Sequence, residues 1–203
     1  DSFGGAIDAS ANTVTFFGYE APASLRINEY QANVTGGCDL VEFRVTSGGT
    51  VRNFQFGERT SKVFTFGGLT VATNDYIVLH FDTNDTNCNP GSATDESAAK
   101  DEFPVSANAN SYDAAWDVWS TDSGLTSTNN VFTLYDANGD IQDAVFGADE
   151  VNGCASAASS TESQAAVVAA ANQWQMVGGG APAGGYIDQD FCDNAVHGLK
   201  TAG

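Results

Sequence analysis

The chain has 203 residues, 42% of them hydrophobic and 11% aromatic, so it can bury one sizeable core and is not a disordered chain. Seven Lys and Arg residues stand against 26 Asp and Glu residues, which gives a formal net charge of −19. Such a surface repels phosphate backbones, so we expect no nucleic-acid partner. No apolar run approaches the length that spans a bilayer, so we expect no membrane insertion.

The four cysteines are Cys38, Cys88, Cys154 and Cys192. None forms a Cys-x-x-Cys pair and none has a histidine at zinc-ligand spacing, so the set indicates two disulfides. Disulfides persist in oxidising compartments, and we therefore expect a secreted or cell-surface protein. Three pairings are open, and we favour Cys38–Cys88 with Cys154–Cys192 because each joins segments near in sequence.

The first part of the chain contains a series of predicted strands. An N-terminal arm, residues 1–22, precedes the main domain and holds the first of them. Most segments alternate apolar and polar side chains with period two, as strands with one buried face do. The last is apolar almost throughout and should be central in its sheet. The predicted strands are residues 12–17, 25–30, 40–45, 51–56, 62–66 and 76–81.

Residues 82–127 are mostly polar and are predicted to be a long loop inserted between strands. The clearest hairpin follows this insertion. Its strands, residues 131–135 and 141–146, flank the sequence Asp-Ala-Asn-Gly-Asp. The Asn-Gly pair accepts positive φ angles and favours a type I′ turn.

A helix is predicted at residues 162–175, because this segment is rich in alanine and Thr161 can serve as its N-cap. It belongs to a C-terminal part, residues 151–203, which a disulfide between the last two cysteines would staple. Many short strands with one late helix predict an all-β fold, a β-sandwich of residues 23–150 with long loops.

Three stretches resemble a known family. Residues 25–30, LRINEY, are similar to an opening strand, and residues 39–43, 64–66 and 76–79 are similar to the strands that follow it. Residues 132–145, FTLYDANGDIQDAV, are similar to a hairpin. Together they resemble the lamin tail domain, an immunoglobulin-like β-sandwich of nuclear lamins and secreted bacterial proteins. The resemblance implies a binding or scaffolding role and no catalytic residues.

The sequence holds no motif that indicates catalysis, and we expect that the protein is not an enzyme. Its two histidines are His80 and His197, and no nucleophile elbow, zinc-protease motif or phosphate-binding glycine loop is present. His80 and Asp82 are two residues apart and should project from one face of a strand. We interpret His80 as a strand-end histidine that pairs with a carboxylate.

Acidic loops make calcium the one cofactor that the sequence suggests, since calcium takes six to eight oxygen ligands. The alternatives are turn chemistry at the hairpin and a solvated acidic face on the insertion. The candidate ligands in the insertion are Asp82, Asp85, Asp95, Glu96 and Asp101, and those at the hairpin are Asp136, Asn138, Asp140 and Asp143.

Two further features bear on binding and assembly. Tyr112, Trp116 and Trp119 could form a platform for sugar rings, or cover the end of the sandwich. Val14, Phe16 and Phe17 in the N-terminal arm could complete a neighbour's sheet and build a fibre, or form an ordinary strand. Asn33 and Asn84 begin glycosylation sequons.

These features favour a non-catalytic extracellular structural or adhesion protein, with fibre or surface-layer assembly as one form of it. The alternative is a calcium-assisted carbohydrate-binding module. The expected partners are other copies of the chain or an extracellular polysaccharide.

Overall fold

The structure is a computed structural model, and it describes residues 20–32, 38–126, 130–147 and 159–173. Within these residues the chain forms ten strands and one helix. They are β1 (Ser24–Gln31), β2 (Leu40–Ser47), β3 (Gly49–Thr50), β4 (Gln55–Glu58), β5 (Ser61–Thr65), β6 (Thr70–Val71), β7 (Tyr76–His80), β8 (Trp116–Trp119), β9 (Asn130–Tyr135), β10 (Ile141–Gly147) and α1 (Ser159–Ala170).

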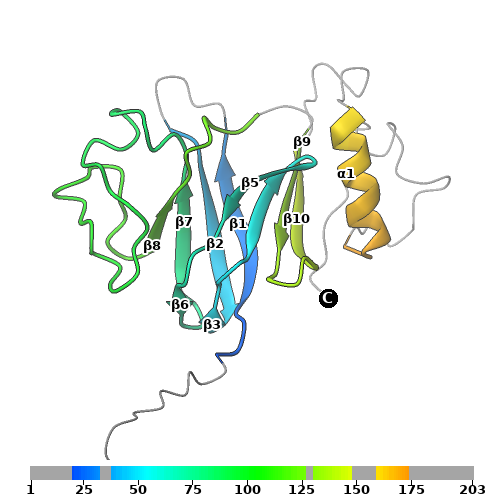
Figure 1. Ribbon diagram of the computed structural model, residues 1–203, viewed down its shortest axis with the longest axis horizontal. Helices are drawn as coiled ribbons and strands as arrows, with labels where there is room; N and C mark the ends of the chain where they lie inside the picture. The colour runs from blue at the N-terminus through cyan, green and yellow to red at the C-terminus, as the bar shows by residue number, and fades with distance from the viewer. Residues whose placement is uncertain (1–19, 33–37, 127–129, 148–158, 174–203) are drawn as a thin grey trace, which may run out of the picture.

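The strands form three sheets, so the fold is mostly β with one short helix near the C-terminus. Two sheets have four strands, in the orders β1-β2-β7-β8 and β10-β9-β4-β5, and β3 pairs with β6 in a small third sheet. In Figure 1 the strands β8, β7, β2 and β1 lie side by side, and β10 and β9 continue beyond β1.

Aromatic side chains from both large sheets meet in one core. The ring of Phe43 on β2 makes an edge contact with the ring of Phe56 on β4, with centroids 5.4 Å apart. Phe56 in turn stacks on Phe132 of β9, and all three side chains are almost fully buried. Apolar burial of this kind is the main favourable term in folding, and here it joins the two sheets.

Side chains of β10 close one side of the two-sheet body. The backbone nitrogen of Leu25 donates to Gln142 Oε1 at 3.0 Å, and that of Ile27 donates to Asp143 Oδ2 at 2.7 Å. These bonds satisfy nitrogens on the outer edge of β1. An edge covered in this way does not offer a template for pairing with another chain.

Most of the strands predicted by alternation are confirmed, and one is displaced. Residues 51–56 were expected to form a strand, but the strand begins only at Gln55. Asn53 has a φ angle of 64°, and the nitrogen of Phe54 donates to the carbonyl oxygen of Val51. A tight turn therefore occupies the start of this segment, although its apolar side chains are buried.

The hairpin between β9 and β10 is confirmed, but its turn is not type I′. That turn requires positive φ at two successive residues, and in this loop only Gly139 has one. The nitrogen of Gly139 donates to the carbonyl oxygen of Asp136, and the nitrogen of Asp136 donates to that of Asp140. The loop is thus a turn followed by a glycine with a left-handed φ angle. A five-residue loop accommodates this conformation better than it does a two-residue type I′ turn.

The insertion contains a strand that the sequence did not predict. β8 pairs in parallel with β7, and Trp119 lies opposite His80. On its other edge, the nitrogen of Asp117 donates to Glu96 Oε2 and that of Trp119 donates to Asp95 Oδ1. The strand depends on these distant partners, which explains why a local pattern did not reveal it.

The helix α1 is confirmed with different bounds, since it begins at Ser159 and ends at Ala170. Thr161 lies inside it and is not its N-cap. Asn172 has a φ angle of 56°, and the nitrogen of Gln173 donates to the carbonyl oxygen of Val168. This left-handed asparagine ends the helix. Gln164 bonds Thr133 Oγ1 and the Tyr135 hydroxyl and so fastens α1 to β9.

Candidate functional site

A pocket of about 460 Å³ lies at one end of the β1-β2-β7-β8 sheet. Gln31 ends β1, Leu40 begins β2 and His80 ends β7, and these residues are neighbours in the strand register. The insertion supplies the opposite wall. The lining residues are Gln31, Cys38, Leu40, His80, Asn87, Val105, Ala109, Asn110, Ser111 and Tyr112.

A buried histidine–aspartate pair underlies the pocket. His80 Nε2 lies 2.7 Å from Asp117 Oδ1, and both side chains are almost fully buried. The imidazole ring stacks on Trp119 with centroids 4.1 Å apart, and on Tyr112 at 5.9 Å. The second oxygen of Asp117 accepts a hydrogen bond from the backbone nitrogen of Tyr112 at 2.7 Å. One carboxylate therefore positions both His80 and Tyr112.

The expectation that His80 pairs with a carboxylate is met, but the partner is not next to it in sequence. Asp82 was expected to share a strand face with His80. Its φ angle of 56° ends the extended backbone after β7. The alternation of side chains stops there, and Asp117 of β8 takes the place that local spacing gave to Asp82.

Two carboxylates predicted as calcium ligands cap the outer edge of β8. Besides its bond to the nitrogen of Asp117, Glu96 accepts a hydrogen bond from the nitrogen of Phe103, and it is 1% exposed. Burial raises the pKa of the Glu96 carboxyl despite these donors. Burial also raises the pKa of Asp95, although the hydrogen bond from the nitrogen of Trp119 acts in the opposite direction. Both side chains are thus used within the fold.

The remaining candidate ligands are spread over the molecule. Asp82 and Asp85 form a group with Cys88, but Cys88 is in a disulfide and is not a thiolate ligand. Asp101 is exposed on the insertion. At the hairpin, Asp136 Oδ1 accepts from the nitrogens of Asn138 and Asp140, which is turn chemistry. Asp143 lies on β10 beside β1.

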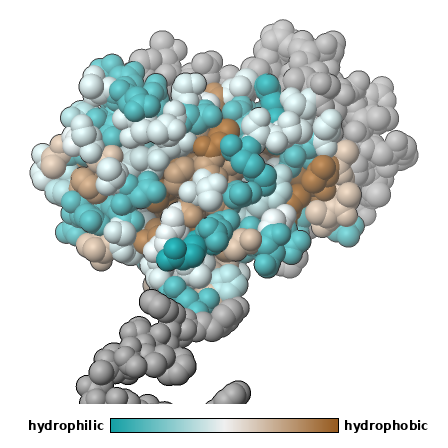
Figure 2. Space-filling view, in the orientation of Figure 1, coloured by the Kyte–Doolittle hydropathy of each residue, from teal (hydrophilic) through white to brown (hydrophobic). Residues whose placement is uncertain are grey.

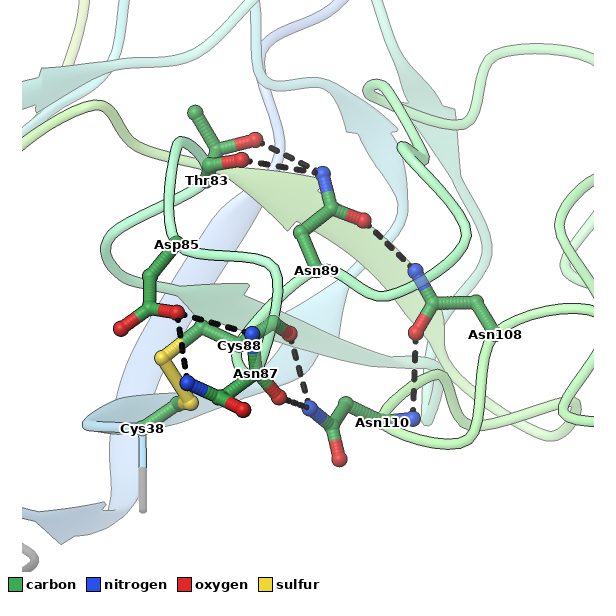
Figure 3. The surroundings of a disulfide bond; sticks show 8 residues. All are labelled: Cys38, Thr83, Asp85, Asn87, Cys88, Asn89, Asn108 and Asn110. Atoms are coloured by element: carbon green, nitrogen blue, oxygen red, sulfur yellow. Dashed lines mark hydrogen bonds between the residues drawn. A yellow bond between two sulfur atoms is a disulfide. The ribbon is translucent and has the colours of Figure 1, made fainter. Parts of the chain in front are cut away.

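The predicted disulfide between Cys38 and Cys88 is present, and an asparagine network surrounds it (Figure 3). Asn110 Nδ2 donates to the carbonyl oxygens of Asn87 and Cys88, both at 2.8 Å. Buried Asn108 donates to buried Asn89, which donates to Thr83. The network ties the two loops that form the pocket wall. Sequence reasoning missed it, although asparagines at 87, 89, 108 and 110 were a visible signal.

The three aromatic residues proposed as a platform do not share one surface. Trp119 is buried beside His80, whereas Trp116 packs against the core and donates its indole N–H to Asp75. Tyr112 alone is exposed at the pocket, with 48% of its surface accessible. Asn84 is exposed in a turn of the insertion. The predictions for Asn33, Val14, Phe16, Phe17, Cys154 and Cys192 lie outside the described residues.

Asp75 anchors the insertion to the sheet. Its Oδ1 lies 2.6 Å from Lys100 Nζ, and its Oδ2 accepts from the nitrogen of Ala72 and from Trp116 Nε1. Desolvation opposes ionisation, but the hydrogen bonds and the charge of Lys100 together outweigh it and hold the pKa of Asp75 below 3.8.

Comparison with known proteins identifies a family. A family model described as "protein second domain" matches residues 23–186. The chain belongs to the protein second domain family. No match was found among curated proteins.

Among the residues described, no helix has the length and apolar character needed to cross a membrane.

Because the chain belongs to the protein second domain family, the resemblance to lamin tail domains is wrong. The three stretches that carried it are alternating strands and a hairpin with an Asn-Gly pair. Such features recur in many antiparallel sheets, because period-two alternation follows from burying one face. They identify strands and not a family.

We predict that Asp75→Asn lowers the free energy of unfolding by about 1 kcal/mol at pH 7, because a charge-assisted bond to Lys100 is lost. The pKa of Asp75 is lowered by folding, so its contribution is present above about pH 3.8 and is lost as pH falls through the folded value. Urea denaturation at several pH values should show the two proteins converging below that point. Asp101→Asn, an exposed control, should stay within about 0.5 kcal/mol of wild type.

Replacing both Cys38 and Cys88 by alanine should lower the free energy of unfolding by roughly 4 kcal/mol, the chain-entropy value for a closed loop of 50 residues. Chemical denaturation of the double variant measures the loss. An unchanged midpoint would mean that the link does not constrain the unfolded chain. The double variant is preferable to a reducing agent, because it removes this disulfide alone.

Proposed function

We propose that this protein is a non-catalytic extracellular adhesion or structural protein that binds an extracellular polysaccharide through the pocket. The proposal depends on one observation. None of the ten lining residues is Asp, Glu, Lys or Arg, although the chain as a whole has a net charge of −19. A concave site with apolar walls and a few polar groups is the usual form of a ligand site.

The pocket geometry favours binding over catalysis. His80 Nε2 is held by Asp117, and the ring is stacked on two aromatic side chains. Ser111 also lines the pocket, but its hydroxyl has no hydrogen-bond partner within the described structure. A serine nucleophile and its base lie within hydrogen-bond reach of each other, and these two residues do not.

The Cys38–Cys88 disulfide supports an extracellular or cell-surface location, because thiols stay reduced in most cytosols. The high negative charge also suits a soluble domain that must not aggregate. We further propose that the two large sheets form an immunoglobulin-like sandwich. The aromatic contacts between β2 and β4 support this arrangement.

A second candidate is a subunit that assembles through its N-terminal arm. Side chains cap the outer edges of β1 and β8. β5 ends its sheet and carries the half-buried Val63 and Phe64, and Ser120 Oγ donates to the carbonyl oxygen of Val63. Figure 2 shows apolar surface along the middle of this face, where Figure 1 places β5. An added strand could pair there.

The polysaccharide proposal predicts that the protein is retained on insoluble polysaccharides in a pull-down at physiological salt. The ligand pocket contains no carboxylate, so retention should persist when a calcium chelator is added. Loss of retention with the chelator would support the calcium-assisted version instead. Absence of retention on every polysaccharide tested would refute the proposal.

The assembly candidate predicts that native material contains oligomers or filaments and that removing residues 1–19 leaves monomers. Electron microscopy and light scattering distinguish these states. Phe16→Asp with Phe17→Asp in the full-length chain is the matched variant, because it keeps the length of the arm. Assemblies that persist in both variants would exclude exchange of the arm.

A further inference from the structure

We propose that the pocket binds an uncharged pyranose unit, with the apolar face of the sugar on Tyr112 and its hydroxyls bonded to Asn87, Asn110 and Ser111. This inference rests on the proposed function and specifies the ligand class and the residues that select it. The pocket has a volume of about 460 Å³, which falls within the range of about 300–1,000 Å³ that small-molecule sites occupy.

The absence of charge in the lining points to a neutral ligand. An anionic ligand would meet no cationic side chain in the pocket and would be repelled by a protein of net charge −19. A cationic ligand would be attracted to the protein but would find no carboxylate in the lining. A neutral, polar ligand needs neither a cationic side chain nor a carboxylate in the lining.

Apolar surface at the mouth of the pocket provides a stacking site. Four large hydrophobic side chains are exposed in the described structure, and two of them, Val105 and Tyr112, each 48% exposed, line this pocket. The Tyr112 ring is held from below by His80, and its backbone by Asp117. A rigid aromatic ring with one accessible face suits the C–H face of a sugar, at little entropic cost.

The amide side chains in the lining have a fixed orientation. Asn110 Nδ2 is engaged with two backbone carbonyls, and Asn87 Nδ2 donates to Asp85 Oδ1 at 2.9 Å. Figure 3 shows the oxygen of each amide without a bond to the other residues drawn. These two oxygens are therefore acceptors that sugar hydroxyls can use.

Ser111 supplies an independent indication of a ligand. It is 4% exposed, lines the pocket, and its Oγ has no hydrogen-bond partner among the described residues. Its backbone nitrogen donates to the carbonyl oxygen of Asn108, which fixes its position. Leaving a buried hydroxyl without a partner costs about 1–3 kcal/mol. Because Ser111 lines the pocket, a ligand hydroxyl bound there can supply the missing partner.

The test is titration calorimetry of the full chain with neutral hexose oligosaccharides and with matched uronic acid and hexosamine series. We expect binding of the neutral series only. Tyr112→Ala should weaken that binding at least about tenfold, since a central aromatic contact is lost. Ser111→Ala should weaken it about threefold to tenfold without lowering the melting temperature, because the hydroxyl makes no bond in the free protein and its burial without a partner is itself unfavourable.

Tyr76→Ala is the matched control. Tyr76 is 37% exposed and lies at the other end of β7 from His80, so its removal should leave the affinity unchanged. Preference for the uronic acid series, or equal binding by wild type and Tyr112→Ala, would overturn the inference. If Tyr112→Ala is still retained on the polysaccharide, the proposed function survives and this site is wrong. If wild type binds no saccharide, both are wrong.

Discussion

The buried carboxylate of Asp117 links the fold to the pocket. Its two oxygens bond His80 and the backbone nitrogen of Tyr112, and its own backbone pairs with Glu96 on the outer edge of β8. A buried charge is tolerated only where hydrogen bonds compensate its lost hydration. That requirement fixes β8, the end of β7 and the pocket wall relative to one another, so the site is preorganised by the same bonds that keep Asp117 in the interior.

Many acidic side chains have structural uses that their abundance in the sequence concealed. Glu96 and Asp95 cap β8, Asp143 caps β1, Asp136 orders the hairpin turn, and Asp75 holds the insertion. An ionised carboxylate accepts strong bonds from backbone N–H groups, so it can end a sheet without exposing an edge. These acids lie around the sheets while the pocket lining is uncharged, and this contrast is the basis for a neutral ligand.

The insertion, residues 82–127, was predicted only in part from the sequence. Its polarity and length predicted a long loop, and the structure shows mostly turns and irregular backbone there together with the strand β8. Cys88 within it was correctly paired with Cys38, because short separations favour pairing between nearby segments. The calcium and platform interpretations grouped residues by nearness in sequence. The structure instead joins Asp117 to His80 and Asn110 to Asn87, partners 37 and 23 residues apart, which no local pattern can reveal.

The sequence by itself determined the strands β1, β2, β7, β9 and β10, because period-two alternation and turn residues are local consequences of burying one face of a sheet. It also determined the existence of the helix, though not its bounds. Tertiary structure alone decided the parallel pairing of β8, the partner of His80 and the position of the pocket. Each of these depends on hydrogen bonds between segments far apart in the chain, and these bonds form only when the insertion folds against β7.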